Sequence, residues 1–365
     1  MARSRNAIAY RPADLSEVPA IDELLQTLGL GPFQPQSIRS VLGRNNNWIG
    51  TTTGGQEVFV KQLHDGDRQA RLARTEHVAR SGEKVLTMPA LLGVDRTASL
   101  IAMAYLPDAE TAATLAARDE FSTELARAAG GQIGTLHRLP CDGFDQSPHP
   151  LPPVQAFAGL SLPYYLQASA AEIEMWRLLQ GDQALADALR TLREQDDAGR
   201  SPRTPIHGDL RLDQFLITAD SVHLSDFEEA RAGDPARDIG AFAGEWLYLA
   251  ATATPATLAG SLMVGQTATH AQIVATGVAE IERRSPMVTA FLDGYVTSRP
   301  AARSDETLVR RAAQFAGWHM LDRMLASAAT TQRLSPTTKA AAGIGRTLLL
   351  NPDDFASTLG LELPC

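Results

Sequence analysis

Two stretches carry the residues that decide the fold: Ile206–Leu216, which reads IHGDLRLDQFL, and His223–Ala230, which reads HLSDFEEA. An acid stands at Asp209, an amide follows five residues later at Gln214, and a second acid stands at Asp226, seventeen residues after Asp209. Each polar group lies beside a short apolar run bounded by turn residues, which is typical of loops at the ends of short strands. Such loops bring side chains from neighbouring strands together.

This combination of side chains suits phosphoryl transfer. One carboxylate must lie in line with the hydroxyl group that accepts the phosphoryl group, and must take its proton. A second carboxylate and a neutral oxygen must hold magnesium against the phosphates, because Mg²⁺ prefers oxygen ligands. Asp209, Asp226 and Gln214 offer these groups in that order of roles.

The loops around Asp209 and Asp226 resemble the catalytic and metal loops of the aminoglycoside-phosphotransferase-like kinases, with His-Gly-Asp at 207–209 and Asp-Phe-Glu at 226–228. Protein kinases, their distant relatives, carry H-R-D-L-x-x-x-N and D-F-G in these places. The resemblance implies ATP and Mg²⁺ as cofactors, Asp209 as the catalytic base, and Gln214 and Asp226 as magnesium ligands. Gln214 departs from the Asn of most relatives, and Glu228 from the Gly of protein kinases.

The N-terminal part extends the resemblance to a nucleotide site. Lys61 ends the strand-like run EVFVK and resembles the lysine that contacts the α- and β-phosphates. Glu76, fifteen residues further on in a predicted helix, is expected to be its ion-pair partner. Met103–Leu106 resembles the hinge that receives adenine, which implies nucleotide contacts from Met103 and Tyr105.

The loop that covers the nucleotide is expected at Leu42–Ile49, LGRNNNWI. It lacks the G-x-G-x-x-G of protein kinases, as relatives that phosphorylate small molecules often do. Asn45, Asn46 and Asn47 tolerate left-handed turns, and we expect their amides to donate hydrogen bonds to phosphate.

Two further matches lie in the C-terminal part. Gly233–Gly240, GDPARDIG, resembles the loop that follows the metal aspartate in this family, with Asp238 capping or buttressing the site. Ala129–Pro140 resembles the helix that precedes the catalytic loop. The resemblance therefore covers most of the chain.

The composition indicates one two-lobed unit or two apposed domains. The chain has 365 residues, 44% of them hydrophobic, which is too much apolar sequence for one small domain. A net charge of −9, without a dense basic cluster among aromatics, argues against nucleic acid as a partner. The two cysteines, Cys141 and Cys365, lie far apart, and no run of about 18 apolar residues occurs. We therefore expect a cytoplasmic protein that neither is secreted nor meets a membrane.

Local patterns predict an α+β protein with the two-lobed protein-kinase-like fold. Residues 1–106 are expected to form a small β-rich lobe, with helices at 14–30 and 68–80 and a strand at 100–106. Residues 107–365 are expected to form a larger, mostly helical lobe, with the catalytic and metal loops at 204–240. Its predicted helices cover 121–139, 172–195 and 305–328. Gly130 and Gly131 in the first of these indicate close packing against another element.

Three functions remain open: two kinds of kinase, which differ in the acceptor, and a scaffold without catalysis. Residues 43–63, GRNNNWIGTTTGGQEVFVKQL, are similar to the kinase-like subunits of class V lanthipeptide and related thioamitide-type pathways. That similarity implies Ser or Thr of a ribosomally made precursor peptide as acceptor, and a separate lyase as partner. The second alternative is a kinase of an aminoglycoside, a macrolide or a sugar; Asp213, Glu228 and Glu229 offer acids for an aminoglycoside. The third is a pseudokinase scaffold that binds nucleotide or peptide, against which the intact lysine and aspartates argue.

Overall fold

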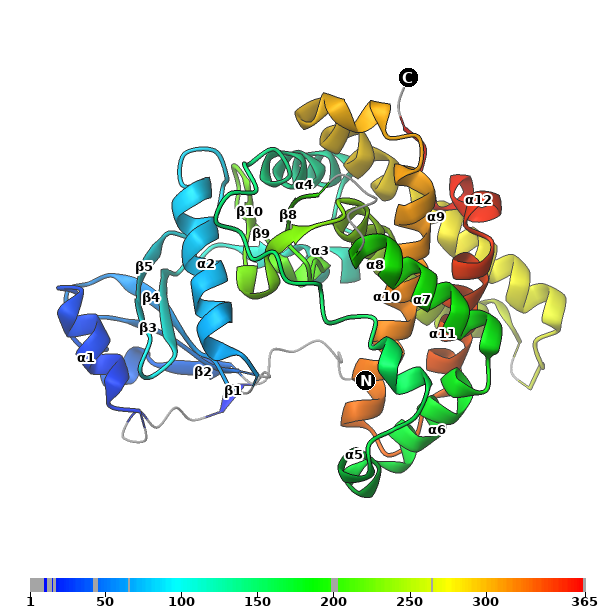
Figure 1. Ribbon diagram of the computed structural model, residues 1–365, viewed down its shortest axis with the longest axis horizontal. Coiled ribbons are helices and arrows are strands. Elements are labelled where there is room, and N and C mark those ends of the chain that lie inside the picture. The colour runs from blue at the N-terminus through cyan, green and yellow to red at the C-terminus, as the bar shows by residue number, and fades with distance from the viewer. Residues whose placement is uncertain are drawn as a thin grey trace. The chain divides into compact units, whose positions relative to one another are not determined.

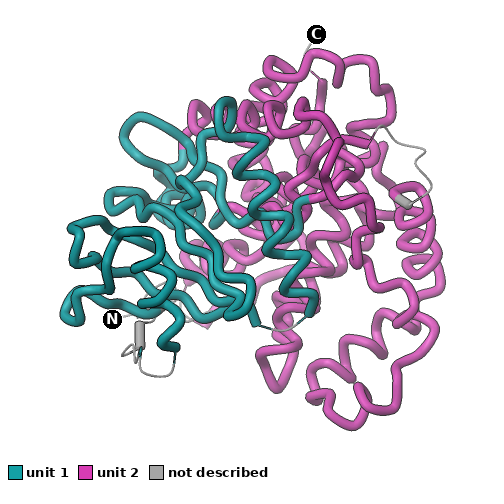
Figure 2. Tube along the Cα trace, turned by 60° about the vertical axis from the view of Figure 1, so that its left-hand side comes forward, with its two compact units in different colours: residues 1–121, 213–230 teal, residues 122–212, 231–365 magenta. Residues whose placement is uncertain are grey.

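A computed structural model describes residues 10–11, 15, 18–41, 45–64, 66–197, 203–263 and 265–363. The chain divides into two compact units (Figure 2): unit 1 comprises residues 1–121 and 213–230, and unit 2 comprises residues 122–212 and 231–365. Within the described residues, no helix combines the length and the apolar character needed to cross a membrane. Unit 1 is rich in strands and unit 2 is mostly helical (Figure 1), which is the predicted α+β architecture.

Unit 1 is built around a six-stranded antiparallel sheet with the strand order β1-β2-β3-β4-β6-β5. Its strands are β1 (Tyr10–Arg11), β2 (Arg39–Val41), β3 (Asn46–Thr51), β4 (Glu57–Gln62), β5 (Leu91–Asp95) and β6 (Leu100–Ala104). Strand β4 lies between β3 and β6, where its alternating sequence buries Val58 and Val60 completely on one face. Lys61 follows Val60 and therefore points to the opposite face.

A helix covers each face of this sheet (Figure 1). Helix α1 (Ala20–Thr27) packs its apolar stripe, Ile21, Leu24 and Leu25, against the face of Val58 and Val60. Helix α2 (Arg68–Gly82) begins at Asp67, whose carboxylate accepts a hydrogen bond from the N–H of Ala70 at 3.2 Å. Its Leu72 packs with Ile101 and Leu63 on the side of Lys61. The predicted helices at 14–30 and 68–80 are confirmed, the first in shortened form.

Residues 213–230 return to unit 1 and form its second sheet. Strands β9 (Phe215–Ile217) and β10 (Val222–Leu224) make an antiparallel hairpin, and β9 also pairs with β7 (Glu110–Thr111), which precedes α3 (Ala112–Ala117). The N–H of Leu224 donates to the carbonyl of Thr87 at 2.8 Å. Because these backbone bonds join the segment to the N-terminal part, the unit boundaries differ from the predicted division at residue 106.

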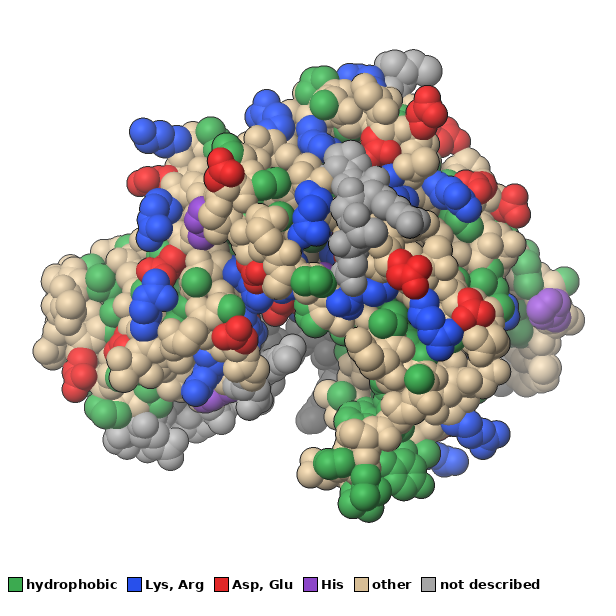
Figure 3. All heavy atoms as spheres, viewed as in Figure 1, with side chains coloured by type: hydrophobic (Ala, Val, Ile, Leu, Met, Phe, Trp, Pro, Cys, Tyr) green, Lys and Arg blue, Asp and Glu red, His purple; other side chains and the backbone are tan. Residues whose placement is uncertain are grey.

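Unit 2 is mostly helical. Its helices are α4 (Thr123–Leu136), α5 (Leu162–Gln167), α6 (Ala170–Gln180), α7 (Gln183–Asp197), α8 (Ala236–Ser261), α9 (His270–Ser298), α10 (Leu308–Thr330), α11 (Pro336–Leu350) and α12 (Pro352–Phe355). A short ladder of β8 (Thr204–Ile206) and β11 (Arg231–Gly233) frames the segment with Asp209. Hydrophobic side chains gather over α5 (Figure 3), where Leu162, Tyr165 and Leu166 are exposed.

Short 3₁₀ turns connect these elements. They are η2 (Pro35–Ser37), η3 (Val154–Phe157), η4 (Leu212–Gln214), η5 (Phe227–Glu229), η6 (Pro300–Ser304) and η7 (Ser357–Leu359). The predicted helix over 172–195 is wrong in one respect, because it is two helices, α6 and α7. They separate at Gly181, and the carboxylate of Asp182 accepts a hydrogen bond from the N–H of Leu185 at 3.1 Å, which starts the second helix.

Helices α4 and α9 approach each other at backbone contact. A methyl group at Gly130 would collide with the carbonyl of Phe291, and one at Gly294 would collide with the carbonyl of Arg127. The close packing predicted from Gly130 is therefore confirmed. Gly131 differs, because a Cβ there would lie 3.4 Å from the Oγ of Ser298, a side chain that is able to move.

We predict opposite effects on stability for two neighbouring substitutions in α4. Gly130→Ala forces the two helix backbones apart and should lower the free energy of unfolding by about 1–3 kcal/mol, the usual cost of overpacking. Gly131→Ala improves helix propensity by up to about 1 kcal/mol and should be neutral or stabilising. Urea denaturation of both variants and the wild type measures the difference. Equal midpoints for the two variants would contradict the proposed backbone contact.

Candidate active site

The β9–β10 hairpin sets the position of Gln214 and Asp226. Phe215 pairs with Leu224 in the ladder, so that Gln214 and Ser225 face each other at its open end. Both the N–H and the hydroxyl of Ser225 donate to the backbone carbonyl of Gln214, each at 2.9 Å. The hairpin therefore places the backbone of Gln214 beside Ser225, the neighbour of Asp226, although twelve positions separate Gln214 and Asp226 in the sequence. The side chain of Gln214 does not line the cavity that Lys61 and Asp226 share.

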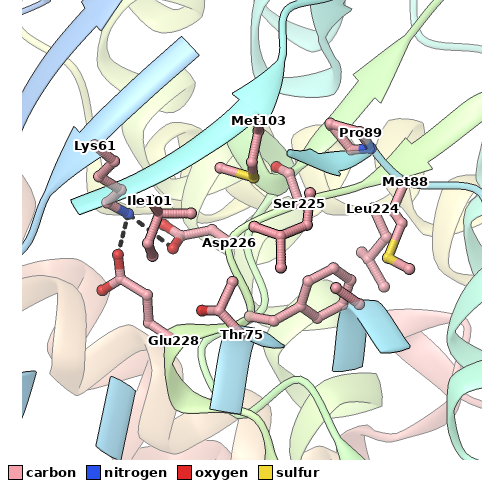
Figure 4. A pocket seen from close by; sticks show the side chains of 13 residues that line it. Lys61, Thr75, Met88, Pro89, Ile101, Met103, Leu224, Ser225, Asp226 and Glu228 are labelled. Carbon is pink, nitrogen blue, oxygen red and sulfur yellow. Dashed lines mark hydrogen bonds and ion pairs between the residues drawn. The ribbon is translucent and has the colours of Figure 1, made fainter. Parts of the chain in front are cut away.

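Asp226 adopts a left-handed backbone conformation, with φ of 65°. Asp and Asn tolerate this region better than other residues with a Cβ, because their short side chains bond locally. The chain turns away from the direction of β10 at this residue, and the carboxylate of Asp226 points towards β4. There the Nζ of Lys61 donates to Asp226 Oδ1 at 2.8 Å (Figure 4). Two of the predicted site residues, 165 positions apart in the sequence, are thus brought into contact.

Glu228 is the second carboxylate on Lys61 (Figure 4). It also bonds the guanidinium of Arg71 on α2. Burial on its own would lower the pKa of Lys61, but Asp226 and Glu228 outweigh it, so the pKa lies above its ordinary value. Burial, then the nearby Asp226, raises the pKa of Glu228, and Lys61 and Arg71 oppose that rise. Two cations and two carboxylates thus form one buried network.

The predicted ion pair between Lys61 and Glu76 is wrong. Glu76 bonds the guanidinium of Arg96 instead. Helical geometry explains the difference, because Arg71, Thr75 and Ala79 lie four residues apart and share the face of α2 towards the site, whereas Glu76 is rotated away from it. Thr75, which faces the site from α2, carries no charge and cannot pair with Lys61. The second carboxylate on Lys61 is that of Glu228, in the expected metal loop.

A narrow, mostly apolar cavity, partly open to solvent, adjoins this network in unit 1. Lys61, Asp226 and Glu228 form its polar edge, and Met103 and Ile101 of β6 line its wall (Figure 4). Apolar walls with a few convergent polar groups are the usual character of ligand sites. Met103, predicted at the hinge, therefore lies in a cavity with the predicted phosphate and metal residues.

The other residues predicted to bind the nucleotide lie in or directly after strands of the six-stranded sheet, or just before one of them. After β6, the N–H of Tyr105 donates to the carbonyl of Glu57 at 3.1 Å, which fixes the start of the expected hinge. Asn46 and Asn47 belong to β3, and the described non-glycine residues with positive φ are Ser99, Asp119 and Asp226. Asn46 and Asn47 therefore take the extended conformation of a strand paired with β4 and make no left-handed turn.

The asparagine side chains have protein partners. The amide of Asn45 donates to Glu228 Oε1 at 3.4 Å, and its oxygen accepts from the N–H of His64 at 3.3 Å. The amide of Asn46 donates to Gln62 Oε1 at 3.3 Å, and that of Asn47 to the carbonyl of Asn45 at 3.2 Å. Residues 42–44 of the expected covering loop lie outside the described residues.

In unit 2, Asp238 holds the backbone next to Asp209. Its carboxylate, completely buried at the start of α8, accepts hydrogen bonds from the N–H groups of His207 at 2.6 Å and Gly208 at 3.0 Å. The buttressing role predicted for Asp238 is therefore confirmed. Burial would raise the pKa of Asp238, but its bond to His137 and the backbone donors outweigh burial, so the pKa is lowered and the carboxylate stays ionised.

The support of Asp238 continues into the helical core. His137 Nε2 lies 3.0 Å from Asp238 Oδ2, and its Nδ1 lies 3.0 Å from the hydroxyl of Tyr295. Arg299 in turn donates to that hydroxyl at 2.8 Å. Burial, above all, lowers the pKa of His137, which favours the neutral ring between its two partners. Residues of α4, α8 and α9 thus hold the Asp209 loop in one place.

A second anchor holds the end of the same loop. Glu245 of α8 accepts the N–H of Leu212 at 3.2 Å and lies 2.7 Å from His319 Nε2 of α10. Burial would raise the pKa of Glu245, but the interaction with His319, the charge of Arg323 and the N–H of Leu212 lower it to about 2. The loop from His207 to Leu212 is thus tied to α8 at both ends.

Asp209 itself is exposed at a concave surface of unit 2. The surrounding protein partly desolvates its carboxyl group, which raises its pKa, and Arg211 opposes the rise. A carboxylate that is reachable and more basic than in water suits a group that accepts a proton. Asp209 belongs to unit 2, whereas Lys61, Gln214 and Asp226 belong to unit 1.

A family model named for phosphotransferase enzymes (APH) matches residues 38–273, which contain both sets of residues. The chain belongs to the phosphotransferase enzyme family. The predicted kinase-like fold and the predicted enzyme class are thereby confirmed. A comparison with curated proteins found no match.

Solved kinases of similar fold cover nearly the whole chain. The amicoumacin kinase hAmiN, in complex with AMP-PNP, Ca²⁺ and Ami, has a TM-score of 0.54 and 14% identity over 93% of this chain and 96% of that one. A choline/ethanolamine kinase family protein from Mesorhizobium loti has a TM-score of 0.52 and 16% identity over 95% and 98%. The ethanolamine kinase of Plasmodium vivax has a TM-score of 0.52 and 12% identity over 95% and 97%. These likenesses show the fold of the phosphotransferase.

Sequence reasoning missed the residues whose role depends on helix packing. Arg71 carried no motif signal, and Glu228 stood out as a departure from the protein-kinase pattern and as an acid for an aminoglycoside, but not as a partner of Lys61. His137 meets Asp238, and Tyr295 meets His137, only after helices far apart in the sequence have packed together.

We predict that Glu228→Gln destabilises the phosphotransferase far more than Glu76→Gln. Removing one charge from a buried network leaves Lys61 and Arg71 underpaired, which costs about 3–5 kcal/mol. Glu76 pairs with a largely exposed arginine, and such pairs contribute about 0–1 kcal/mol. Thermal and urea denaturation compare the two variants. A larger loss for Glu76→Gln would mean that the sequence prediction, and not the structure, identifies the partner of Lys61.

The lowered pKa of Glu245 predicts a pH dependence. Because the pKa is below its unfolded value near 4.5, the stabilisation is present above pH 4.5 and is lost as pH falls towards 2. At neutral pH it amounts to about 3 kcal/mol. The free energy of unfolding of the wild type should therefore fall more steeply between pH 5 and 2 than that of Glu245→Gln. Parallel curves for the two proteins would show that Glu245 is not held ionised by its partners.

Proposed function

We propose that this phosphotransferase transfers the γ-phosphoryl group of ATP to a hydroxyl group in the presence of Mg²⁺. The observation that carries the proposal is the 2.8 Å contact between Lys61 and Asp226. It joins a cation suited to the phosphates and a carboxylate suited to magnesium at one edge of an apolar cavity. The solved complex of the amicoumacin kinase with AMP-PNP supports the use of a nucleotide.

Unit 1 offers the kind of ligands with which nucleotide-binding enzymes hold magnesium. Mg²⁺ is usually bound by one or two carboxylates together with substrate phosphates and water, not by a complete protein cage. Asp226 offers one carboxylate, the amide oxygen of Gln214 is proposed as a second ligand, and the described residues hold no cluster of three or more His, Cys, Asp or Glu side chains for a metal. When bound, Mg²⁺ would reduce the negative charge of the phosphates. Glu228 is held by Lys61 and Arg71, which favours a supporting role.

In the proposed reaction, Lys61 binds the α- and β-phosphates and Asp209 orients the acceptor hydroxyl. The oxygen of that hydroxyl forms a bond to the γ-phosphorus as the bond from phosphorus to the β–γ bridging oxygen breaks. ADP leaves with the electron pair, and the hydroxyl proton passes to Asp209. The two anchors at Asp238 and Glu245 hold the Asp209 loop rigid, so that little reorganisation is needed.

The proposed acceptor is a hydroxyl of one of two chemical classes. The similarity of residues 43–63 to lanthipeptide-type kinases favours Ser or Thr of a precursor peptide, whose phosphate a separate lyase would then eliminate. The solved kinases of similar fold include enzymes named for amicoumacin and for ethanolamine, which favours a small molecule as the alternative. The concave surface around Asp209 is small and partly enclosed, so either class would insert one group of limited size.

We predict different losses for two conservative variants. Asp226→Asn keeps the left-handed turn and removes a magnesium ligand, so that the stabilisation by ATP with Mg²⁺ should disappear. Asp209→Asn should keep that stabilisation, about 2.7 kcal/mol at a concentration of one hundred times Kd, and lose phosphoryl transfer. Thermal unfolding with ATP, Mg²⁺ and both together measures the first effect, and ADP formation with candidate acceptors measures the second.

Three outcomes would contradict the proposal or one of the roles it assigns. If the wild type is not stabilised by ATP with Mg²⁺, unit 1 does not hold a nucleotide site. If it is stabilised but Asp209→Asn retains full transfer activity, the base is another residue. Stabilisation without transfer to any acceptor would favour the pseudokinase scaffold.

A further inference from the structure

A groove of about 430 Å³ lies between α5 and α6 in unit 2. It is wide and open, whereas the space at the concave surface beside Asp209 is about 30 Å³. Ligand-binding clefts usually measure about 300–1,000 Å³, so the groove has the size of a ligand site and the surface beside Asp209 admits one small group. A large acceptor that inserts its hydroxyl at Asp209 therefore makes its other contacts elsewhere.

One side of α6 lines the groove. Four of its residues are three or four positions apart and therefore share that side of the helix. They are Ile173, Trp176, Arg177 and Gln180. Tyr165 of α5 and Leu160 before it add apolar surface from the facing segment. The groove thus combines an apolar lining with one arginine.

Helix α5 is exposed on every side. None of the residues Leu162–Gln167 is buried, although their sequence, LPYYLQ, is mostly apolar. Leu162 is 67% exposed and Leu166 is 73% exposed, and hydrophobic side chains gather over this helix (Figure 3). Apolar side chains that are exposed together in one place are typical of interaction sites.

Hydrogen bonds within the chain hold α5 beside α6. The hydroxyl of Tyr164 donates to the carboxylate of Glu172 at 2.9 Å and accepts from the indole N–H of Trp176 at 3.0 Å. The same carboxylate accepts the N–H of Ser169 at 2.8 Å, at the start of α6. Because the protein's own bonds shape the groove, a ligand binds there with little cost for ordering it.

Arg177 is the free charge that a ligand of the groove meets. Its side chain is exposed and has no ion pair or side-chain hydrogen bond within the described residues. The two acids of α6 are already engaged, Glu172 as described and Glu174 with Lys339. Residues 146–171 contain no Asp, Glu, Lys or Arg. The groove therefore favours a ligand with a negative charge among apolar groups.

This free charge argues against a second copy of the chain as the occupant. In a two-fold dimer the same surface of each copy faces the other. The acids of α6 are engaged, so Arg177 of each copy would meet another cationic groove and no free carboxylate. An external segment that supplies its own acid fits the groove better.

Residues 151–160 connect the groove with the surface at Asp209. Leu151 lines that surface, and Leu160, nine residues further along, lines the groove. Nine residues span at most about 32 Å, because an extended chain advances by about 3.6 Å per residue. One peptide of moderate length can therefore occupy the groove and present a hydroxyl to Asp209.

We propose that the groove between α5 and α6 binds a segment of the acceptor peptide that carries apolar side chains and a carboxylate, at some distance in sequence from the serine or threonine that is phosphorylated. This inference rests on the proposed phosphoryl transfer and favours its peptide acceptor. The apolar side chains pack on Tyr165 and Ile173, and the carboxylate pairs with Arg177. Binding through a remote segment raises the local concentration of the hydroxyl at Asp209, so it lowers KM and leaves kcat unchanged.

The test uses the whole chain and two labelled synthetic peptides. In one peptide an apolar segment carries glutamates, and in the matched peptide it carries lysines. A linker of about twelve uncharged residues, which reaches about 40 Å when extended, joins the segment to a single serine.

Three variants are compared with the wild type. Arg177→Glu reverses the charge in the groove, and Tyr165→Ser removes apolar surface from it. Arg80→Glu is the matched control, because Arg80 is also an exposed arginine in the last turn of a helix. Urea denaturation checks that the variants fold. If Arg177→Glu does not fold, Arg177→Gln replaces it and should abolish the preference between the peptides.

Fluorescence anisotropy without nucleotide measures binding. The wild type should bind the glutamate peptide about three- to tenfold more tightly than the lysine peptide, because Arg177 attracts one and repels the other. Arg177→Glu should reverse this preference, Tyr165→Ser should weaken the binding of both peptides, and Arg80→Glu should bind as the wild type does.

Transfer from radiolabelled ATP with Mg²⁺ measures the consequence for turnover. The KM for the glutamate peptide should be about tenfold below that for the same peptide without its apolar segment, at equal kcat. Arg177→Glu should remove most of this difference and leave the KM of the shortened peptide unchanged.

Equal affinity of the wild type for the two peptides, or an unchanged preference in Arg177→Glu, would overturn the inference. So would a wild type that binds the glutamate peptide and is stabilised by ATP with Mg²⁺ but does not phosphorylate the serine. A wild-type dimer that Tyr165→Ser separates, with unchanged affinity for the peptides, would assign the surface to a second copy and also overturn it. Absence of stabilisation by ATP with Mg²⁺ contradicts the proposed function instead, and the anisotropy still decides whether the groove binds the peptide.

Discussion

A lysine ammonium on the covered face of a central strand must be paired with carboxylates, and in unit 1 this requirement is met at Lys61 by Asp226 and Glu228. The acids come from a segment that is distant in sequence, so residues 213–230 must return to the N-terminal sheet. The β7–β9 pairing and the bond between Leu224 and Thr87 hold that return in place. Arg71 then neutralises the second carboxylate. Helix α2 therefore contributes a cation to this network, and not the carboxylate that was expected from Glu76.

In unit 2 the buried charge that must be compensated is negative. The buried carboxylate of Asp238 is compensated by two backbone donors and by His137, and the satisfied network fixes the loop that carries Asp209. The carboxylate of Glu245 likewise accepts a backbone hydrogen bond from Leu212, at the end of the same loop. The two anchors lie seven residues apart on α8, that is, about two turns on the same face of one helix, so a single rigid element positions the whole loop. A rigid loop of this kind keeps a proton acceptor in place during transfer.

The residues proposed to handle phosphate and those near the proposed base differ in where they come from. Lys61 and Asp226 lie in short segments that a motif search finds. The side chains around Asp209, such as His149, Arg237 and Trp318, come from a loop and two helices that line one concave surface. Family membership identifies the reaction class and leaves the acceptor to be tested.

The motifs and their order were enough to predict the kinase-like fold, the phosphotransferase class and the buttress at Asp238, because phosphoryl transfer demands particular side chains at short, fixed spacings. Alternating burial in β4 and the apolar stripe of α1 likewise followed from local periodicity. Local patterns did not predict three features: the partner of Lys61, the strand conformation of Asn46 and Asn47, and the unit boundaries. Each of these depends on which distant segment packs or pairs alongside. A helix face rotates by about 100° per residue, so Glu76 and Thr75 point in different directions, and only the packed position of α2 decides which of them meets the site.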